Sequence, residues 1–264
     1  MGTSTQPTND YTRVVLVTGA AQGIGRAIAL RLAADGLDVA LDDLENNIDS
    51  LKDVAQEVER LGRKAVVITS DVTKEKEVEE MVEATVSALG RLDVMVANAG
   101  VGSGVNSVMD AKIEDWEKCW DVNIKGVLFS YKYAARQMVK QGSGGRIIGA
   151  SSVCGVRGFA GVGAYCVSKA AVRSLTQTTA LELREFGITV NAYAPGVIES
   201  SMTATEADKE HGPGFGIKRL LKFGDEFRTG QPADVAAVAS FLASPDAHFV
   251  TGQTISVNDG VYLS

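Results

Sequence analysis

Short apolar runs alternate along the chain with longer segments in which apolar residues recur every three or four positions. The short runs predict strands, because turn residues bound them and they are too short for helices. They lie at residues 14–17, 39–41, 65–68, 93–97, 146–150, 189–193 and 254–257. The longer segments predict helices at residues 23–35, 46 or 49 to 61, 73–89, 113–119, 123–140, 164–185 and 234–243.

This alternation predicts an α/β fold. Strands that are apolar throughout, such as Val94–Ala97, are typical of a parallel sheet that is buried on both faces. We therefore expect one Rossmann-type domain over residues 13–264. It would be a doubly wound parallel sheet of about seven strands with helices on both faces. Residues 1–12 are expected to form a flexible tail.

The segment from about 200 to 230 interrupts the alternation. It contains charged residues, several glycines and three phenylalanines that look exposed, Phe215, Phe223 and Phe227. It follows the sixth predicted strand, and ligands bind at the carboxyl ends of the strands in such sheets. We predict that this segment is a mobile substrate flap.

Composition argues against several classes of protein. The net charge is −7, and no basic stripe is present, so nucleic acid is not expected as a partner. The sequence contains no run of about 18 apolar residues, so no membrane span is predicted. The polar N-terminus lacks the apolar core of a signal peptide, and the 3 cysteines show no pairing pattern, so we expect a cytoplasmic protein with free thiols. Cysteines and histidines are too dispersed for a zinc site, so no metal is predicted.

A glycine-rich turn follows the first predicted strand. It runs Thr18-Gly19-Ala20-Ala21-Gln22-Gly23-Ile24-Gly25 and opens the first predicted helix. Glycines let the backbone approach a pyrophosphate, and the N-terminus of a helix offers unpaired N–H groups and a positive dipole end. A strand before the turn and a helix after it are the context that a dinucleotide site requires. The residues predicted to bind it are Gly19, Gln22, Gly23, Ile24 and Gly25.

Asp43 ends the second predicted strand. An acidic side chain at this position accepts hydrogen bonds from the ribose hydroxyls of the adenosine and repels a 2′-phosphate. Neither Gln22 nor Leu44 is basic, so we expect NAD(H) as the cofactor rather than NADP(H). A register shifted by one residue assigns this role to Asp42 instead.

The third and fourth predicted strands end in residues suited to the same cofactor. Asp71 and Val72 follow the third strand, and Asn98-Ala99-Gly100 follows the fourth. The carboxyl ends of parallel strands meet at the ligand-binding edge. Asp71 is expected to accept a hydrogen bond from the adenine amino group while Val72 packs on the ring. Asn98 is expected to fix the strand end, and Gly100 to allow close approach of the cofactor.

Three polar residues after the fifth predicted strand indicate acid–base chemistry. Tyr165 and Lys169 are four residues apart on one predicted helix, so they share a face, and Ser152 lies at the end of the strand. A nearby ammonium and a nicotinamide cation favour the phenolate of Tyr165. The phenolate takes a proton from an alcohol, or the phenol gives one to a carbonyl oxygen. Ser152 is expected to hold the substrate oxygen.

Taken together, these motifs resemble those of the short-chain dehydrogenase/reductase family over nearly the whole chain. The matching pieces are Thr18 to Gly25, Asp71-Val72, Asn98-Ala99-Gly100, Asn123, Ser152, Tyr165-x-x-x-Lys169 and Pro195-Gly196. Ala97 stands where the family more commonly has Asn. Within the family, the stretch Gly187–Gly196 and the 200–230 segment look similar to diacetyl/acetoin reductases, which are 2,3-butanediol dehydrogenases.

The resemblance implies a catalytic tetrad of Asn123, Ser152, Tyr165 and Lys169. It implies that Asn123 holds a water that bridges to Lys169, and that Lys169 also binds the nicotinamide ribose. It further implies a homotetramer or homodimer and a small alcohol or carbonyl substrate, such as a diketone, a hydroxyketone or a polyol. The residues that it places near the nicotinamide are Pro195, Gly196, Ile198 and Ser200.

Two alternatives to this oxidoreductase remain open. One is a nucleotide-binding regulator that has lost catalysis on the same fold; the intact Ser152, Tyr165 and Lys169 set argues against it. The other is a 3-oxoacyl carrier-protein reductase, for which NADPH and a basic docking patch are expected. Asp43 and the acidic charge balance argue against that alternative.

Overall fold

The computed structural model describes residues 11–263. Most of the predicted tail, residues 1–10, lies outside the described residues. Tyr11 and Thr12 lead directly into the first strand.

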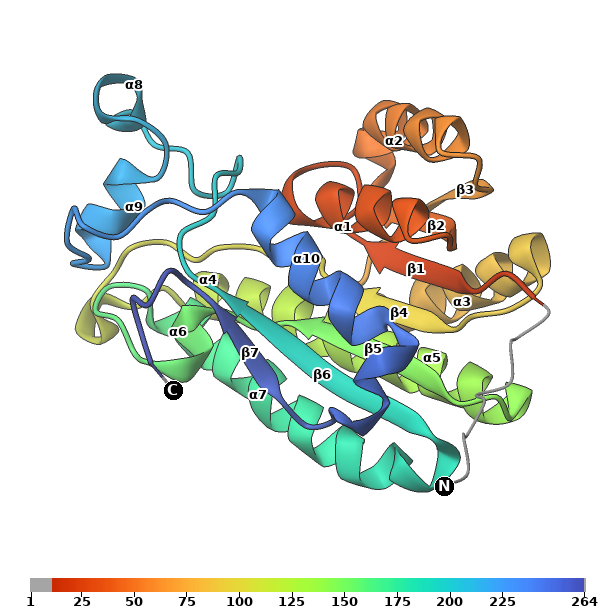
Figure 1. The fold of residues 1–264 in the computed structure, drawn as a ribbon. Coiled ribbons are helices and arrows are strands. Elements are labelled where there is room, and N and C mark those ends of the chain that lie inside the picture. The colour runs from red at the N-terminus through yellow and green to blue at the C-terminus, as the bar shows by residue number, and fades with distance from the viewer. Residues whose placement is uncertain (1–10, 264) are drawn as a thin grey trace, which may run out of the picture.

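Seven parallel strands form one sheet, as predicted (Figure 1). The strands are β1 (Val14–Thr18), β2 (Asp38–Asp43), β3 (Ala65–Thr69), β4 (Val94–Ala97), β5 (Gly145–Ala150), β6 (Ile188–Pro195) and β7 (Thr254–Val257). Their order across the sheet is β3-β2-β1-β4-β5-β6-β7. The chain therefore reverses its progress across the sheet between β1 and β4, and a crevice forms where the connections diverge.

Helices cover both faces of this sheet, which confirms the doubly wound arrangement. The long helices are α1 (Gly23–Ala34), α2 (Ile48–Arg60), α3 (Glu75–Leu89), α5 (Gly126–Gln141), α7 (Gly163–Leu183) and α10 (Pro232–Ala243). Apolar residues of α1, α2 and α10 pack on one face, and those of α3, α5 and α7 pack on the other. Two short helices, α4 (Ile113–Cys119) and α6 (Val153–Val156), precede α5 and α7.

The predicted helix at 123–140 begins differently in the structure. Residues Trp120–Lys125 form a π-helical turn, η3, that joins α4 to α5. Asn123 in this turn is fully buried, and its amide pairs with both the backbone N–H and the backbone C=O of Val101. A π-helical turn is wider than an α-helical one. These two hydrogen bonds attach it to the loop after β4.

The 200–230 segment folds into two short helices, α8 (Asp208–His211) and α9 (Phe215–Leu220), which project from the body of the molecule (Figure 1). The expectation that its phenylalanines are exposed is wrong for Phe223, which is buried among apolar side chains of α6 and α7. Phe215 and Phe227 are half-buried. The rings of Phe223 and Phe227 lose exposure because they pack against an apolar cluster formed by residues distant in the sequence, which local sequence does not reveal.

Asp208 holds this segment together. Its carboxylate accepts hydrogen bonds from the backbone N–H and hydroxyl of Thr205 and from the backbone N–H groups of Gly214 and Gly216. Donation from the Gly216 N–H is the largest cause that lowers the pKa of Asp208 to about 2. The ionised form is thus favoured in the fold, so its contribution is present above pH 4 or so and is lost as pH falls toward 2.

We predict that Asp208→Asn loosens the segment. The new amide side chain would place an NH₂ group where a carboxylate oxygen now accepts hydrogen bonds from the Gly214 or Gly216 N–H. Because that hydrogen bond is lost, limited proteolysis within 200–230 should become severalfold faster at neutral pH. The matched control is Asp225→Asn, which removes only an exposed ion pair with Arg219. Equal cleavage rates for the wild type and Asp208→Asn would contradict this role.

Candidate active site

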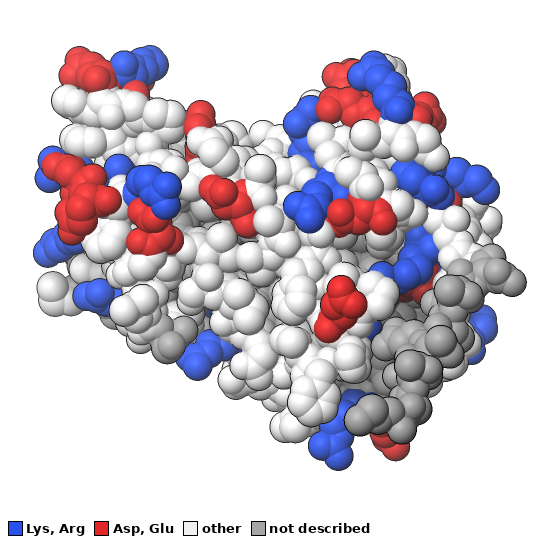
Figure 2. Space-filling view, in the orientation of Figure 1, with Lys and Arg blue, Asp and Glu red and all other residues white. Residues whose placement is uncertain are grey.

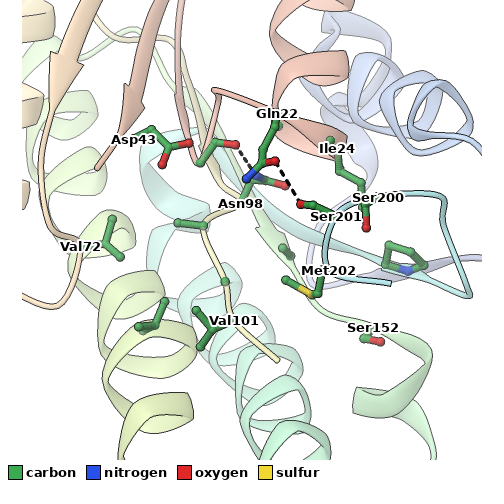
Figure 3. Close-up of a pocket in the computed structure, with 18 of the residues that line it drawn as sticks. Gln22, Ile24, Asp43, Val72, Asn98, Val101, Ser152, Ser200, Ser201 and Met202 are labelled. Carbon is green, nitrogen blue, oxygen red and sulfur yellow. Dashed lines mark hydrogen bonds between the residues drawn. The ribbon is translucent and has the colours of Figure 1, made fainter. Parts of the chain in front are cut away.

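One pocket of about 370 Å³ lies at the carboxyl edge of the sheet. It contains every residue predicted above to bind cofactor or substrate except Asn123. Figure 3 shows Asp43 toward one end of the pocket and Ser152 toward the other, with Gln22, Asn98 and Met202 between them. A site for an adenosine and a site for acid–base chemistry therefore share one continuous cavity.

Sequence reasoning missed other residues that line this pocket. They are Leu44, Asn47, Ser70, Val101, Val122, Ala150, Ser151, Tyr193, Ser201, Met202 and Thr203, together with Asp42, which the sequence offers only as the alternative to Asp43. Most come from strand ends or from the start of the 200–230 segment. Their positions just after predicted strands were the one signal available.

The glycine-rich turn has the backbone geometry that its sequence predicts. Gly19 and Gly23 have φ of +65° and +56°, values that favour glycine. Gly25 packs directly on the turn, because a Cβ at this residue would lie 2.0 Å from the Gly19 carbonyl oxygen. The turn is thus compact enough for its backbone to approach a ligand closely.

Asn98 connects this turn to three strands. Its amide nitrogen donates to the carbonyl oxygens of Thr18 (2.9 Å) and Gly19 (3.2 Å), and its backbone N–H donates to the Thr18 hydroxyl. The hydroxyl of Tyr193 on β6 donates to the Asn98 Oδ1 at 2.8 Å. The predicted role of Asn98 in fixing the end of β4 thus extends to the turn after β1 and to β6.

Asp43, rather than Asp42, points toward the turn. Its Oδ2 accepts a hydrogen bond from the Ala21 N–H at 3.0 Å, and its Oδ1 accepts from the Leu44 N–H and the Asn47 amide. Oδ2 accepts one hydrogen bond and keeps a further lone pair for a ligand, whereas both lone pairs of Oδ1 are already used. Figure 3 shows this carboxylate beside the glycine-rich turn.

Asp42 is almost completely buried on the same strand. Its Oδ1 accepts a hydrogen bond from the Ser70 hydroxyl at 2.7 Å, whereas its Oδ2 has no partner among the described residues. Burial raises the pKa of Asp42 well above its ordinary value. The two adjacent acids therefore differ in burial: Asp42 is enclosed beside Ser70, whereas Asp43 is the half-buried one that hydrogen-bonds to the glycine-rich turn.

Asp71 and Val72 also line the pocket. The Asp71 carboxylate accepts hydrogen bonds from the backbone N–H and hydroxyl of Thr73, which fixes the turn between β3 and α3. Helix α3 begins at Glu75, two residues later than predicted. The Val72 side chain lies against Gly126 at the start of α5.

The predicted acid–base residues come together at the other end of the pocket. Tyr165 and Ser152 line the same part of the pocket, and the Ser152 hydroxyl is close enough to act on the pKa of the phenol. The Lys169 ammonium lies 5.5 Å from the centre of the Tyr165 ring and donates to the Ala150 carbonyl oxygen at 3.0 Å. Strand β5 and helix α7 thus place the hydroxyl, the phenol and the amine around one space.

Burial dominates the ionisation of this group. It raises the pKa of Tyr165 above its ordinary value, and the nearby Ser152 hydroxyl only partly opposes this shift. Burial also lowers the pKa of Lys169 to about 8. The prediction that an ammonium and a nicotinamide cation together favour the phenolate concerns the site with its cofactor bound, and it stays a prediction.

Asn123 lies behind the pocket rather than on its wall. Besides Val101, its amide nitrogen donates to the Ser168 hydroxyl at 3.0 Å. A Cβ added to Gly100 would lie 3.1 Å from the Lys169 Nζ and 3.2 Å from the Asn123 Oδ1. Gly100 thus keeps open a small space that both polar groups face, which is where a bridging water is predicted.

The 200–230 segment reaches the glycine-rich turn. The Ser201 hydroxyl donates to the Gln22 side-chain oxygen at 3.0 Å, as the dashed line in Figure 3 shows. The Thr203 hydroxyl donates to the Ile198 carbonyl oxygen. The Ser200 hydroxyl lies within hydrogen-bonding distance of the Thr203 hydroxyl. Residues that follow β6 therefore form one wall of the pocket.

Over residues 11–263, no group of three or more His, Cys, Asp or Glu side chains is arranged as metal ligands. No helix in the described part of the chain is both long enough and apolar enough to cross a membrane.

Comparisons with known proteins agree with this geometry. Residues 19–262 match the family model described as enoyl-(acyl carrier protein) reductase. A short-chain dehydrogenase/reductase of Armillaria gallica is 48% identical over 94% of this chain and 95% of its own. A diacetyl reductase [(S)-acetoin forming] of Staphylococcus epidermidis is 40% identical over 94% of this chain and 98% of its own.

A solved structure also resembles this one. Carveol dehydrogenase from Mycobacterium avium, in complex with NAD, superimposes with a TM-score of 0.85 at 29% identity, over 94% of this chain and 97% of that one. The sequence matches, the sheet order and the shared pocket lead to one conclusion: this chain belongs to the short-chain dehydrogenase/reductase family and is an oxidoreductase that acts on CH–OH groups or the corresponding carbonyls.

Proposed function

We propose that this oxidoreductase uses NAD(H) and that Tyr165 is its acid–base residue. The observation that carries the proposal is the single pocket that runs from Asp43 and the glycine-rich turn to Ser152, Tyr165 and Lys169. The glycine-rich turn, with Gly19, Gly23 and Gly25 in the pocket wall, supplies the close backbone approach that a dinucleotide requires. When bound, the nicotinamide supplies the group that accepts or gives the hydride.

Each residue has a role in this proposal. Ser152 holds the substrate oxygen through its hydroxyl, and Tyr165 exchanges a proton with that oxygen. Lys169 binds the nicotinamide ribose and, with Asn123 and a water, passes the proton onward. The nicotinamide end of the cofactor would be held by Pro195, Gly196, Ile198 and Ser200, which line the same pocket.

The choice of NAD(H) over NADP(H) rests on Asp43. Its carboxylate faces the turn where an adenosine ribose would lie, and an anion there repels a 2′-phosphate. The nearby cation on α1, Arg26, is paired with Glu57 by two hydrogen bonds. The carveol dehydrogenase that this chain resembles was solved with NAD.

The proposed substrate is a small alcohol or ketone, such as a diketone, a hydroxyketone or a polyol. Support comes from the diacetyl reductase to which the chain is similar over nearly its full length. In the same proposal, the 200–230 segment is a flap over this substrate, since Ser201, Met202 and Thr203 line the pocket.

The two alternatives are less well supported. A regulator without catalysis would not need Ser152, Tyr165 and Lys169 to converge on one space. A 3-oxoacyl carrier-protein reductase is expected to carry a basic docking patch. In Figure 2, acidic and basic residues are interspersed on the visible face, and the surface between the α8–α9 segment and α2 is mostly uncharged.

We also propose a homotetramer or homodimer in the cytoplasm. Large apolar side chains are exposed on helices and loops of the single chain, where a second copy would cover them. They include Trp120, Leu181, Phe241 and Phe249, of which Phe249 is 92% exposed. The three cysteines are free, which agrees with a reducing compartment.

We predict that Tyr165→Phe lowers kcat by at least about 100-fold, because the variant lacks the proton that general acid–base catalysis requires. The measurement is the change in nicotinamide absorbance with a panel of diketones, hydroxyketones and diols. The control is Tyr133→Phe, which removes a distant phenol that hydrogen-bonds to Glu75 on the protein surface. Near-normal turnover by Tyr165→Phe would exclude its proposed role.

We further predict that Asp43→Asn raises the ratio of kcat/KM with NADP to that with NAD by about tenfold, a change of ~1.4 kcal/mol. The amide keeps an oxygen acceptor for neighbouring N–H groups but removes the charge that repels the phosphate. The control is Asp49→Asn on α2, where the carboxylate is 94% exposed. If both variants keep the wild-type ratio, Asp43 does not select the cofactor.

A further inference from the structure

The geometry points to a redox-active dithiol, Cys154 and Cys166, beside the catalytic residues. We propose that a hydroperoxide converts this pair into a disulfide and that the disulfide reversibly switches the enzyme off. The formation of the disulfide is independent of the function proposed above. Its effect on turnover rests on that function, so the two are tested by separate measurements.

The backbone brings the two cysteines together from different helices. Helix α6 lies directly against α7: a Cβ at Gly155 would be 2.5 Å from the Lys169 carbonyl oxygen, and the Ser151 hydroxyl donates to that oxygen at 3.0 Å. Cys154 precedes Gly155, and Cys166 lies one turn before Lys169 on α7. The two side chains therefore meet across the α6–α7 contact.

Both side chains lie in one apolar cluster. The cluster also holds Val153, Val162 and Phe223, and Tyr165 packs against it. The two thiols are close neighbours, since each is the largest influence on the pKa of the other. Both are mostly buried, with 6% and 8% of their surface exposed. A disulfide between them requires the sulfurs to approach to ~2.05 Å.

Cys166 is the better nucleophile of the pair. It lies near the start of α7, a helix of 21 residues whose N-terminal dipole end favours a thiolate. Hydrogen bonds from the Cys154 thiol, the largest cause, and from backbone N–H groups lower the pKa of Cys166 to about 6. The same contact and burial raise the pKa of Cys154, so that thiol stays protonated.

These properties give the order of the oxidation step. The Cys166 thiolate attacks the peroxide, the O–O bond breaks, and a sulfenic acid forms while the alcohol or water product takes a proton. The Cys154 sulfur then attacks the sulfenic sulfur, the S–O bond breaks, and water leaves with the thiol proton. In sum, two thiols are oxidised by two electrons, and one hydroperoxide is reduced.

The disulfide would disturb the site because each cysteine is adjacent to a catalytic residue. The Ser152 hydroxyl accepts a hydrogen bond from the Cys154 N–H at 3.1 Å, and Cys166 directly follows Tyr165. Drawing the sulfurs together shifts α6 relative to the start of α7, and thus the Ser152 hydroxyl relative to the phenol. A displacement of about 1 Å at reacting groups costs on the order of 100-fold in rate.

The third cysteine supplies a matched control. Cys119 is buried at the end of α4, and its thiol contacts the Gly102 carbonyl oxygen. Burial raises the pKa of Cys119, so it lacks the thiolate character of Cys166. Cys119→Ser should therefore respond to peroxide as the wild type does.

The test treats the full-length wild type, Cys119→Ser, Cys154→Ser and Cys166→Ser with graded hydrogen peroxide. Peptide mapping without reduction should find a Cys154–Cys166 linked peptide in the wild type and in Cys119→Ser. Turnover of these two proteins should fall by about 100-fold and recover with dithiothreitol. Cys166→Ser should resist peroxide, and Cys154→Ser should lose activity without recovering it, because its sulfenic acid has no resolving thiol.

Two results would overturn the proposal. In the first, peroxide oxidises Cys119 in the wild type while Cys154 and Cys166 both remain free thiols, as shown by their reaction with an alkylating reagent. The other is a linked peptide at full yield in an enzyme that keeps its turnover. The peptide map of the wild type decides the first point even where a serine variant fails to fold or no substrate has been found.

Discussion

The reversal of strand order between β1 and β4 is the constraint on which the site depends. The chain after β1 leads to one side of the sheet and the chain after β4 to the other, so the backbone opens only at this edge. Asn98 spans the opening and ties the Thr18 and Gly19 carbonyls to β4, while Tyr193 holds the Asn98 oxygen from β6. A pocket that needs backbone N–H groups free for a ligand thus obtains its rigidity from one side-chain amide.

Burial has opposite effects on the two titratable groups at the reacting end. It raises the pKa of the Tyr165 phenol and lowers that of the Lys169 amine to about 8. At neutral pH the phenol therefore keeps its proton, and the amine is still mostly protonated but loses its proton more readily than a free lysine does. Two groups that can each give up a proton thus face one space.

The sequence predicted those features that depend on local spacing. The glycines of the turn, Asp43 at a strand end, and Tyr165 four residues before Lys169 are each set by one strand or one helix. Tyr193 escaped prediction because its partner, Asn98, is 95 residues away in the chain. The π-helical turn at Asn123 escaped it for the same reason: its cause is a pairing with the Val101 backbone, which helical periodicity does not reveal.

The 200–230 segment joins the two ends of the pocket. Ser201 binds Gln22 in the glycine-rich turn, whereas Phe223 packs beside Tyr165 in the cluster of α6 and α7. One continuous stretch of chain therefore contacts both the turn and the acid–base end. Since the hydrogen bonds of Asp208 fix the backbone between these two contacts, the segment connects the two ends of the pocket through a short, ordered stretch of chain.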